Sequence, residues 1–174
     1  MTNRPSSPFT IDNAVQRRTM LWLMVVVACL SACSTSSQPT DNGVQRVVIA
    51  GQTFELELAI NGADRYQGLS DRESLPPGGG MLFVFPDVEP QTFVMRRCLM
   101  PIDLIFLGAD GRIVQMHAMK MEPYDRDESA LKRYRSVWPA QFAIELEGGQ
   151  LAQLGLKNGD PVDLPVETLK AMAR

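Results

Sequence analysis

The sequence has 174 residues and a formal net charge of −3 at pH 7. This length suits one domain with appended segments. The acidic balance, without any basic cluster, argues against a nucleic acid as partner. Of the three cysteines, only Cys98 lies beyond residue 33, so no intramolecular disulfide is expected in the domain.

The first 33 residues resemble a bacterial lipoprotein signal. Arg17 and Arg18 precede an apolar run, Met20–Leu30, that is shorter than the ~20 residues needed to span a bilayer. The run leads into Leu-Ser-Ala-Cys, which resembles a lipobox ending at Cys33. We therefore expect residues 1–32 to be a signal peptide and Cys33 to be lipidated. A plain secretory signal or an uncleaved membrane anchor is the alternative interpretation.

Cleavage before Cys33 would give an acidic protein that depends on its lipid for attachment to the membrane. The polar residues 33–43 are predicted to be a flexible tether. Without residues 1–32, 14 basic and 19 acidic side chains remain, a net charge of −5, so a cationic face for anionic lipids is not expected. Ser34 stands where Gram-negative sorting rules would place Asp to retain a lipoprotein at the inner membrane. The sequence therefore favours the outer membrane, facing the periplasm.

Regular strand patterns begin near Val44. Val47–Ile49 is predicted as a short strand, and Phe54–Ile60 as a longer one because apolar and polar residues alternate with a period of two. Ala63–Leu69 is predicted as one or two helical turns, with Gly68 as the left-handed residue that ends them.

Three apolar runs follow in the centre of the chain, separated by turn residues. They are Met81–Phe85, Thr92–Met95 and Ile102–Leu107. A fourth begins at Ile113, and the Asp110-Gly111 pair before it predicts a hairpin with a type I′ turn.

The last third of the chain is predicted from shorter patterns. The charged segment Tyr124–Arg135 indicates a surface loop. Residues 142–146 alternate as a strand does, with Glu145 and Glu147 facing water. Gly155 is expected to end a short helix over Gln150–Leu154, and a last strand over Val162–Leu164 and a frayed helix after Pro165 complete the pattern.

Seven to nine short strands with only one or two short helices predict a mainly β fold, either an antiparallel β-barrel or a sandwich. The long helices that a doubly wound sheet requires do not occur in the sequence pattern. We expect the domain to cover residues 44–165, with residues 166–174 as a C-terminal tail.

Four blocks carry a resemblance to a known family. They are Arg65–Arg72 (RYQGLSDR), Gly80–Phe85 (GMLFVF), Phe93–Phe106 (FVMRRCLMPIDLIF) and Phe142–Val162 (FAIELEGGQLAQLGLKNGDPV). In this order they resemble the DUF192 family, a bacterial and archaeal domain of unknown function, over most of residues 45–164. The resemblance implies a β-rich fold with few short helices and brings no agreed activity.

Asp103 is the most informative candidate for a site, because it lies inside an apolar run. A carboxylate there must be hydrogen-bonded or paired with a cation. Its neighbours on the same face, Ile105 and Leu107, are apolar, so that face is expected to be covered. We predict an arginine close by, with Arg72 as the first choice. The pair could be structural or could face a ligand, and both interpretations remain open.

A ligand site is predicted around Asp103. Arg65, Arg72, Met95 and His117 are the further candidates to line one cavity with it.

Soft metal ligands concentrate in the segment after Ile113. His117, Met119 and Met121 would share one face of a strand, and Cys98 offers a thiol, a set that suits Cu(I). We nevertheless expect the methionines to pack in the core and Cys98 to be a buried inert thiol, and the metal site is the alternative. We predict no cofactor and keep Cu(I) as the alternative.

No established catalytic motif occurs in the sequence, such as G-x-S-x-G, H-E-x-x-H or C-x-x-C. An enzyme is therefore not expected. We expect an envelope lipoprotein whose domain is a non-catalytic binding module for a small ligand or an envelope component. A structural or protein–protein interaction role in the envelope and the handling of Cu(I) are the alternatives.

Overall fold

The computed structural model describes residue 1 and residues 43–174 of the chain. The predicted signal peptide, the lipidation site Cys33 and residues 33–42 of the predicted tether lie outside these described residues. Across residues 43–174, every helix is too short or too polar to cross a membrane.

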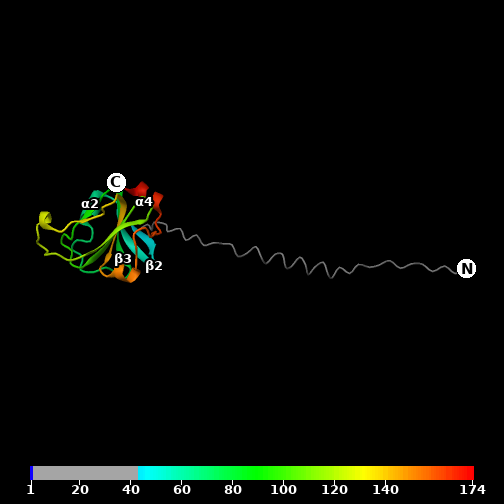
Figure 1. Ribbon diagram of the computed structural model, residues 1–174, viewed down its shortest axis with the longest axis horizontal. Helices are drawn as coiled ribbons and strands as arrows, with labels where there is room; N and C mark the ends of the chain where they lie inside the picture. Colours follow the sequence, from blue (N-terminus) through cyan, green and yellow to red (C-terminus); the bar gives the residue numbers. More distant parts are fainter. Residues whose placement is uncertain (2–42) are drawn as a thin grey trace. The chain divides into compact units, whose positions relative to one another are not determined.

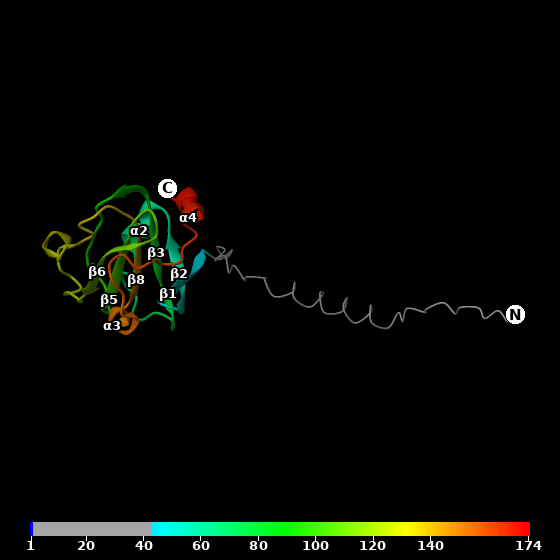
Figure 2. The ribbon, with the colours of Figure 1, turned by 45° about the vertical axis from the view of Figure 1, so that its right-hand side comes forward.

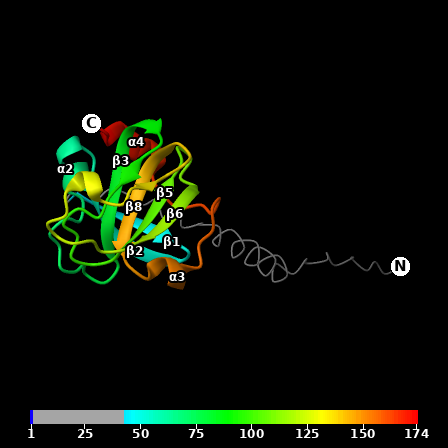
Figure 3. The same cartoon turned by 60° about the vertical axis from the view of Figure 1, so that its left-hand side comes forward.

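Residues 43–174 are built around one mixed sheet of six strands in the order β1-β2-β3-β8-β5-β6. Figure 3 shows β3, β8, β5 and β6 side by side. A separate small sheet pairs β4 with β7. The strands are β1 (Val44–Ile49), β2 (Gln52–Ala59), β3 (Gly79–Glu89), β4 (Thr92–Phe93), β5 (Ile102–Leu107), β6 (Ile113–Met119), β7 (Tyr134–Arg135) and β8 (Ala140–Glu147). The helices of this part of the chain are α2 (Gly62–Gln67), the 3-10 helix η1 (Glu128–Ala130), α3 (Gln150–Leu154) and α4 (Val166–Met172).

Two hairpins form where turn residues interrupt alternating strands. β1 and β2 join through Ala50-Gly51, and both residues have the positive φ (48° and 80°) that a type I′ turn requires. β5 and β6 form the hairpin predicted at Asp110-Gly111. The type I′ turn predicted there is wrong. Gly111 has a φ of 76°, but Asp110 does not have a positive φ, and the Gly111 N–H donates to the Gly108 carbonyl at 3.0 Å.

The pair β2 and β3 is parallel, and α2 lies in the connection between them. Parallel strands cannot be joined by a tight turn and need a crossover of about a dozen residues or more. Asn61 caps the start of α2, because its side chain accepts a hydrogen bond from the Asp64 N–H at 3.0 Å. Gly68 ends the helix with a φ of 50°, as predicted.

The prediction of a mainly β, sandwich-like fold with short helices is confirmed. The sheet is mixed rather than wholly antiparallel because of the β2–β3 pair. It does not close into a barrel, because β1 and β6 remain its two edges.

Both faces of the central strands are covered by apolar side chains. On β5, Ile102 and Phe106 belong to one core, whereas Ile105 and Leu107 belong to the other. Full burial of one such side chain stabilises the fold by about 1.5–3 kcal/mol. Both faces of the sheet therefore contribute to the stability of the domain.

Different segments cover the two faces. Met95 and Met100, from the segment between β4 and β5, pack into the first core, together with Tyr134 of β7. Leu151 of α3 and Leu169 of α4 pack against the second core. Figure 2 shows α3 and α4 at opposite ends of the domain.

The remaining element predictions are partly confirmed. The predicted strand Thr92–Met95 shortens to the two residues of β4, because only Thr92 and Phe93 pair with β7. The predicted loop Tyr124–Arg135 contains η1 and β7, and Figure 1 shows this yellow segment projecting from the sheet. Val162–Leu164 makes an isolated bridge, Val48 with Asp163, instead of a strand. The helix predicted after Pro165 is confirmed as α4.

Candidate ligand-binding cleft

A cleft of about 360 Å³ opens beside the end of α2. Its walls come from five segments that are distant in the sequence: the end of α2 with the turn after it, β3, the segment from β4 onward, the loop of η1 and β8. The lining residues are Arg65–Ser70, Phe83, Phe85, Thr92–Val94, Arg96, Cys98, Glu128, Arg133 and Glu145.

Phe93 forms an aromatic wall of the cleft together with Phe83 and Phe85. The ring centroid of Phe93 lies 4.9 Å from that of Phe83 and 6.3 Å from that of Phe85, both edge to face. This is the arrangement that aromatic rings prefer. A third edge-to-face contact, to Phe106 at 5.4 Å, packs Phe93 against the buried strand β5. The rings therefore offer a fixed apolar surface for the body of a ligand.

Glu145 of β8 is the buried acidic group of the cleft. It is 4% exposed, its carboxyl receives a hydrogen bond from the backbone N–H of Leu69, and its Oε2 atom has no hydrogen-bond partner. Burial raises the pKa of Glu145 to about 8, against the opposing effects of the Leu69 hydrogen bond and the Arg72 charge. Near neutral pH the group is mainly the neutral acid, which can donate one hydrogen bond.

The cation that acts on Glu145 is already paired with another carboxylate. Arg72 donates to the two carboxylate oxygens of Glu57 at 2.5 and 2.6 Å. The hydrogen bonding from Arg72 lowers the pKa of Glu57, as a bidentate pair does. Because Glu57 offsets the charge of Arg72, the attraction of Arg72 for an ionised Glu145 is weakened.

Cys98 lines the same cleft as a buried free thiol. Burial raises the pKa of Cys98 to about 12, and the charge of Glu145 acts in the same direction. The prediction of a buried thiol is confirmed. A thiol with this pKa is not a thiolate at neutral pH and is therefore a poor nucleophile.

The mouth of the cleft carries positive charge. The Arg96 guanidinium lies 3.6 Å from the ring centroid of Tyr66, donates to the Tyr66 carbonyl and pairs with Glu128 at 3.5 Å. Arg133 is exposed, and within residues 43–174 its guanidinium has no hydrogen-bond or ion-pair partner.

Of the predicted ligand-binding residues, Arg65 lines this cleft. Its guanidinium donates to the backbone carbonyls of Ile60, Val84 and Arg174 at 2.8 to 3.0 Å. Arg65 therefore ties α2 to β3 and to the C-terminus. Met95 is 1% exposed in the first core, and neither Met95 nor Arg72 is among the lining residues.

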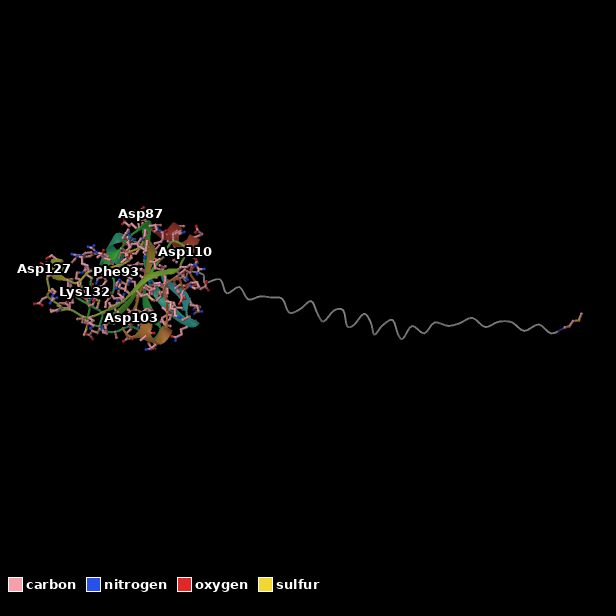
Figure 4. All side chains as sticks on the ribbon, viewed as in Figure 1. Asp87, Phe93, Asp103, Asp110, Asp127 and Lys132 are labelled. Carbon is pink, nitrogen blue, oxygen red and sulfur yellow. The ribbon has the colours of Figure 1, made fainter. Side chains whose placement is uncertain are left out.

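Asp103 caps a helix instead of pairing with an arginine. It is 2% exposed, and its Oδ2 atom accepts hydrogen bonds from the backbone N–H groups of Gly149 at 2.9 Å and Leu151 at 2.7 Å, at the start of α3. The predicted burial and hydrogen bonding are confirmed. The predicted pair with Arg72 is wrong, because Arg72 binds Glu57. Figure 4 shows Asp103 near the end of the domain that carries α3.

The predicted metal candidates have different surroundings. His117 hydrogen-bonds the Arg135 carbonyl through Nε2 at 2.8 Å, so this ring nitrogen carries the proton. Met119 is buried in the first core, whereas Met121 lies beyond β6 and is 55% exposed. Among the residues that the structure describes, no three side chains of His, Cys, Asp and Glu are grouped so that they could hold a metal ion.

The sequence pattern places Glu145 wrongly in water. Alternation assigns the two faces of β8 correctly, but it treats one face as solvated, whereas β8 lies between β3 and β5 and both of its faces are covered. Ala143 was the one residue in the sequence that could have indicated burial of this face. It shares the face of Glu145, and a solvated face more often carries a polar residue there. Ala143 is fully buried in the first core.

Comparison with known proteins places the chain in a family. No curated protein matches it. The chain is similar to a protein of unknown function from Novosphingobium aromaticivorans DSM 12444, with 31% identity and a TM-score of 0.60 over 74% of this chain and 91% of that one. It is also similar to a protein from Sinorhizobium meliloti 1021 with a provisional description as a transcription regulator, with 32% identity and a TM-score of 0.57 over 67% and 88%. Residues 45–164 match the DUF192 family, described as "Uncharacterized ACR", and the chain therefore belongs to this family.

Proposed function

We propose that the domain is a non-catalytic binding module that takes a small ligand in the cleft beside α2. The observation that carries this proposal is the Oε2 atom of Glu145, a buried oxygen without a partner in the wall of an open cleft. A buried polar group without a partner costs about 1–3 kcal/mol of stability. A leucine would avoid this cost, so the carboxyl is best explained by a hydrogen bond that forms when a ligand is bound.

The chemistry of the cleft supports binding over catalysis. A covalent mechanism needs a nucleophile with an adjacent base. The thiol of Cys98, with its pKa of about 12, does not supply the nucleophile at neutral pH. His117 does not line the cleft, and its Nε2 atom is hydrogen-bonded to a backbone carbonyl.

The proposed place of action is the periplasmic face of the outer membrane, with the domain held by a lipid on Cys33. The lipobox at the end of residues 1–33 and the polar segment after it support this location. Intact-mass analysis of the protein from the membrane fraction tests it. We expect a chain that begins at an acylated Cys33, and an unmodified Cys33 in a protein from the soluble fraction would contradict this location.

A fragment screen by NMR on the isotope-labelled protein tests the binding function. We expect hits that shift the amide signals of Leu69, Val94 and Cys98. Glu145→Leu should weaken these hits about tenfold, as the loss of one buried hydrogen bond predicts.

The matched control is Glu147→Leu, because Glu147 lies two residues along the same face of β8 but is exposed. This variant should bind the hits as the wild type does. A screen without any hit at the cleft, or hits of equal strength in Glu145→Leu, would contradict the binding function.

A further inference from the structure

The charges around the cleft are unbalanced. Three arginines line it, Arg65, Arg96 and Arg133, against two acidic residues, Glu128 and Glu145. The guanidinium of Arg65 is bound by backbone carbonyls and that of Arg96 by Glu128 and Tyr66. Arg133 is thus the lining cation that has its hydrogen-bond donors free, as judged within residues 43–174.

The protonation of Glu145 adds to this excess of positive charge. The groups that face its carboxyl are Arg72, which is offset by Glu57, the neutral thiol of Cys98 and the N–H of Leu69. Since the pKa of Glu145 is about 8, the empty cleft at neutral pH has the three arginines against Glu128 alone. An anion is then the favoured ligand, and the protonated Glu145 is a hydrogen-bond donor inside the cleft.

We propose that the ligand is a small organic carboxylate with an apolar body, an inference that rests on the binding function proposed above. Arg133 binds the carboxylate at the mouth, Phe93 and its neighbouring rings contact the body, and Glu145 donates a hydrogen bond to an acceptor atom at the inner end. Arg133 thereby selects an anionic group at one end of the ligand, and Glu145 selects a hydrogen-bond acceptor at the other end. An amine ligand would instead need the ionised form of Glu145 and would meet the unpaired Arg133.

Three probes that share one body test the charge of the ligand. They are para-methoxyphenylpropionate, the corresponding propanol and the corresponding propylamine. The ether oxygen that all three contain can accept a hydrogen bond but cannot donate one. We expect the carboxylate to bind about tenfold more tightly than the alcohol, because an ionic hydrogen bond to Arg133 is added. The amine should bind most weakly.

Arg133→Gln should remove the advantage of the carboxylate over the alcohol. The matched control is Arg135→Gln, because Arg135 is an exposed arginine of β7 that does not line the cleft. This control should leave all three affinities unchanged.

The hydrogen bond from Glu145 is tested by pH. Between pH 7 and pH 9 the protonated fraction of a group with a pKa of about 8 falls about tenfold, so binding of the carboxylate should weaken by a similar factor. Glu145→Gln has an amide N–H₂ that donates at both pH values and should remove this pH dependence. Cys98, with its pKa of about 12, does not change protonation in this range.

The outcomes separate this inference from the binding function. If the alcohol or the amine binds the cleft as tightly as the carboxylate, or if the binding of the carboxylate strengthens as pH rises, the carboxylate inference is overturned and the binding function stands. If none of the three probes shifts signals at the cleft while other fragments do, the carboxylate inference is also overturned. If no compound of any charge binds there, both fail.

Discussion

The Oε2 atom of Glu145 lies 3.6 Å from the position that a Cβ atom on Gly68 would take. The ring of Phe83 lies 3.5 Å from the same position. Gly68 has a φ of 50° and a ψ of −137°, a conformation that residues with a side chain rarely adopt. The glycine that ends α2 therefore leaves open the space next to the unpartnered Oε2 atom of the Glu145 carboxyl group.

Gly68→Ala is expected to narrow the cleft at Glu145. The added methyl group would occupy the space in front of Oε2, so fragment binding should weaken about tenfold or more, as the loss of one hydrogen bond predicts. The positive φ should also lower the free energy of unfolding by about 1–2 kcal/mol. NMR titration and thermal melts measure the two effects separately.

Gly51→Ala is the control for backbone strain. Gly51 also has a positive φ, of 80°, and its added Cβ would meet no atom within 4 Å. It should lose stability to a similar extent and keep its affinity. If Gly68→Ala binds fragments as well as the wild type does, the ligand does not occupy the space in front of Oε2.

Glu145→Gln is expected to change how stability depends on pH. The pKa of Glu145 is about 8 in the folded protein and near its ordinary value of 4.5 in the unfolded chain. Between these values the unfolded chain has lost the proton and the folded protein keeps it, so the stabilisation from this group is complete below pH 4.5 and is lost as pH rises to 8. The free energy of unfolding should fall by about 1.4 kcal/mol per pH unit in this window.

Denaturant titrations at pH 5, 6.5, 8 and 9 measure this difference. Because glutamine does not titrate, the wild type should lose stability relative to Glu145→Gln as pH rises, and the difference should level off above pH 8. Glu147→Gln should show no such trend. A wild type that keeps a constant difference from Glu145→Gln across this range would exclude a raised pKa.

The Arg72–Glu57 pair is expected to influence the pKa of Glu145. The positive charge of Arg72 lowers the pKa of Glu145, so Arg72→Gln should raise that pKa further. Glu57→Gln removes the carboxylate that pairs with Arg72 and should lower the pKa of Glu145. The pair is partly exposed, and each variant should lose only about 0–1 kcal/mol of stability. Carbon-13 NMR of the Glu145 carboxyl group follows both shifts, and shifts of the same sign would exclude this coupling.

Asp103 is expected to matter for stability and not for ligand binding. Asp103→Leu leaves the N–H groups of Gly149 and Leu151 without their acceptor, at a cost of about 1–3 kcal/mol each. Asp103→Asn keeps an acceptor oxygen but replaces hydrogen bonds to a charged group by neutral ones, and should lose about 1 kcal/mol. Thermal melts compare the two variants, and both should bind fragments as the wild type does. A melt of Asp103→Leu that coincides with that of the wild type would show that the capping bonds do not stabilise the domain.

Much of the fold could be predicted from local patterns. Alternation predicted the strand at Phe54, an apolar run indicated the strand at Ile102, and glycine predicted the ends of α2 and α3. These features depend on residues that are close in the sequence. The parallel pairing of β2 with β3 could not be predicted, because it depends on the path of the chain through the whole connection. The same holds for β4 and β7, whose two-residue strands are formed by pairing alone.

The candidate site was predicted less well than the fold. Asp103 was correctly expected to be buried and hydrogen-bonded, but its partners are backbone groups 46 and 48 residues away. Glu145 was assigned to solvent, because its burial depends on β8 being a central strand. Arg133 lines the cleft from a loop whose sequence only indicates exposure. A site built from five distant segments leaves no compact signature in the sequence.

A titration of the Glu145 carboxyl group by carbon-13 NMR, with and without para-methoxyphenylpropionate, tests the central claim most directly. We expect a pKa of about 8 in the free protein and a higher value with the probe bound, because a ligand that prefers the protonated acid stabilises that form. A carboxyl group that titrates near 4.5, or one whose pKa is the same with a saturating probe, would contradict the account of Glu145 as the buried donor of a ligand site.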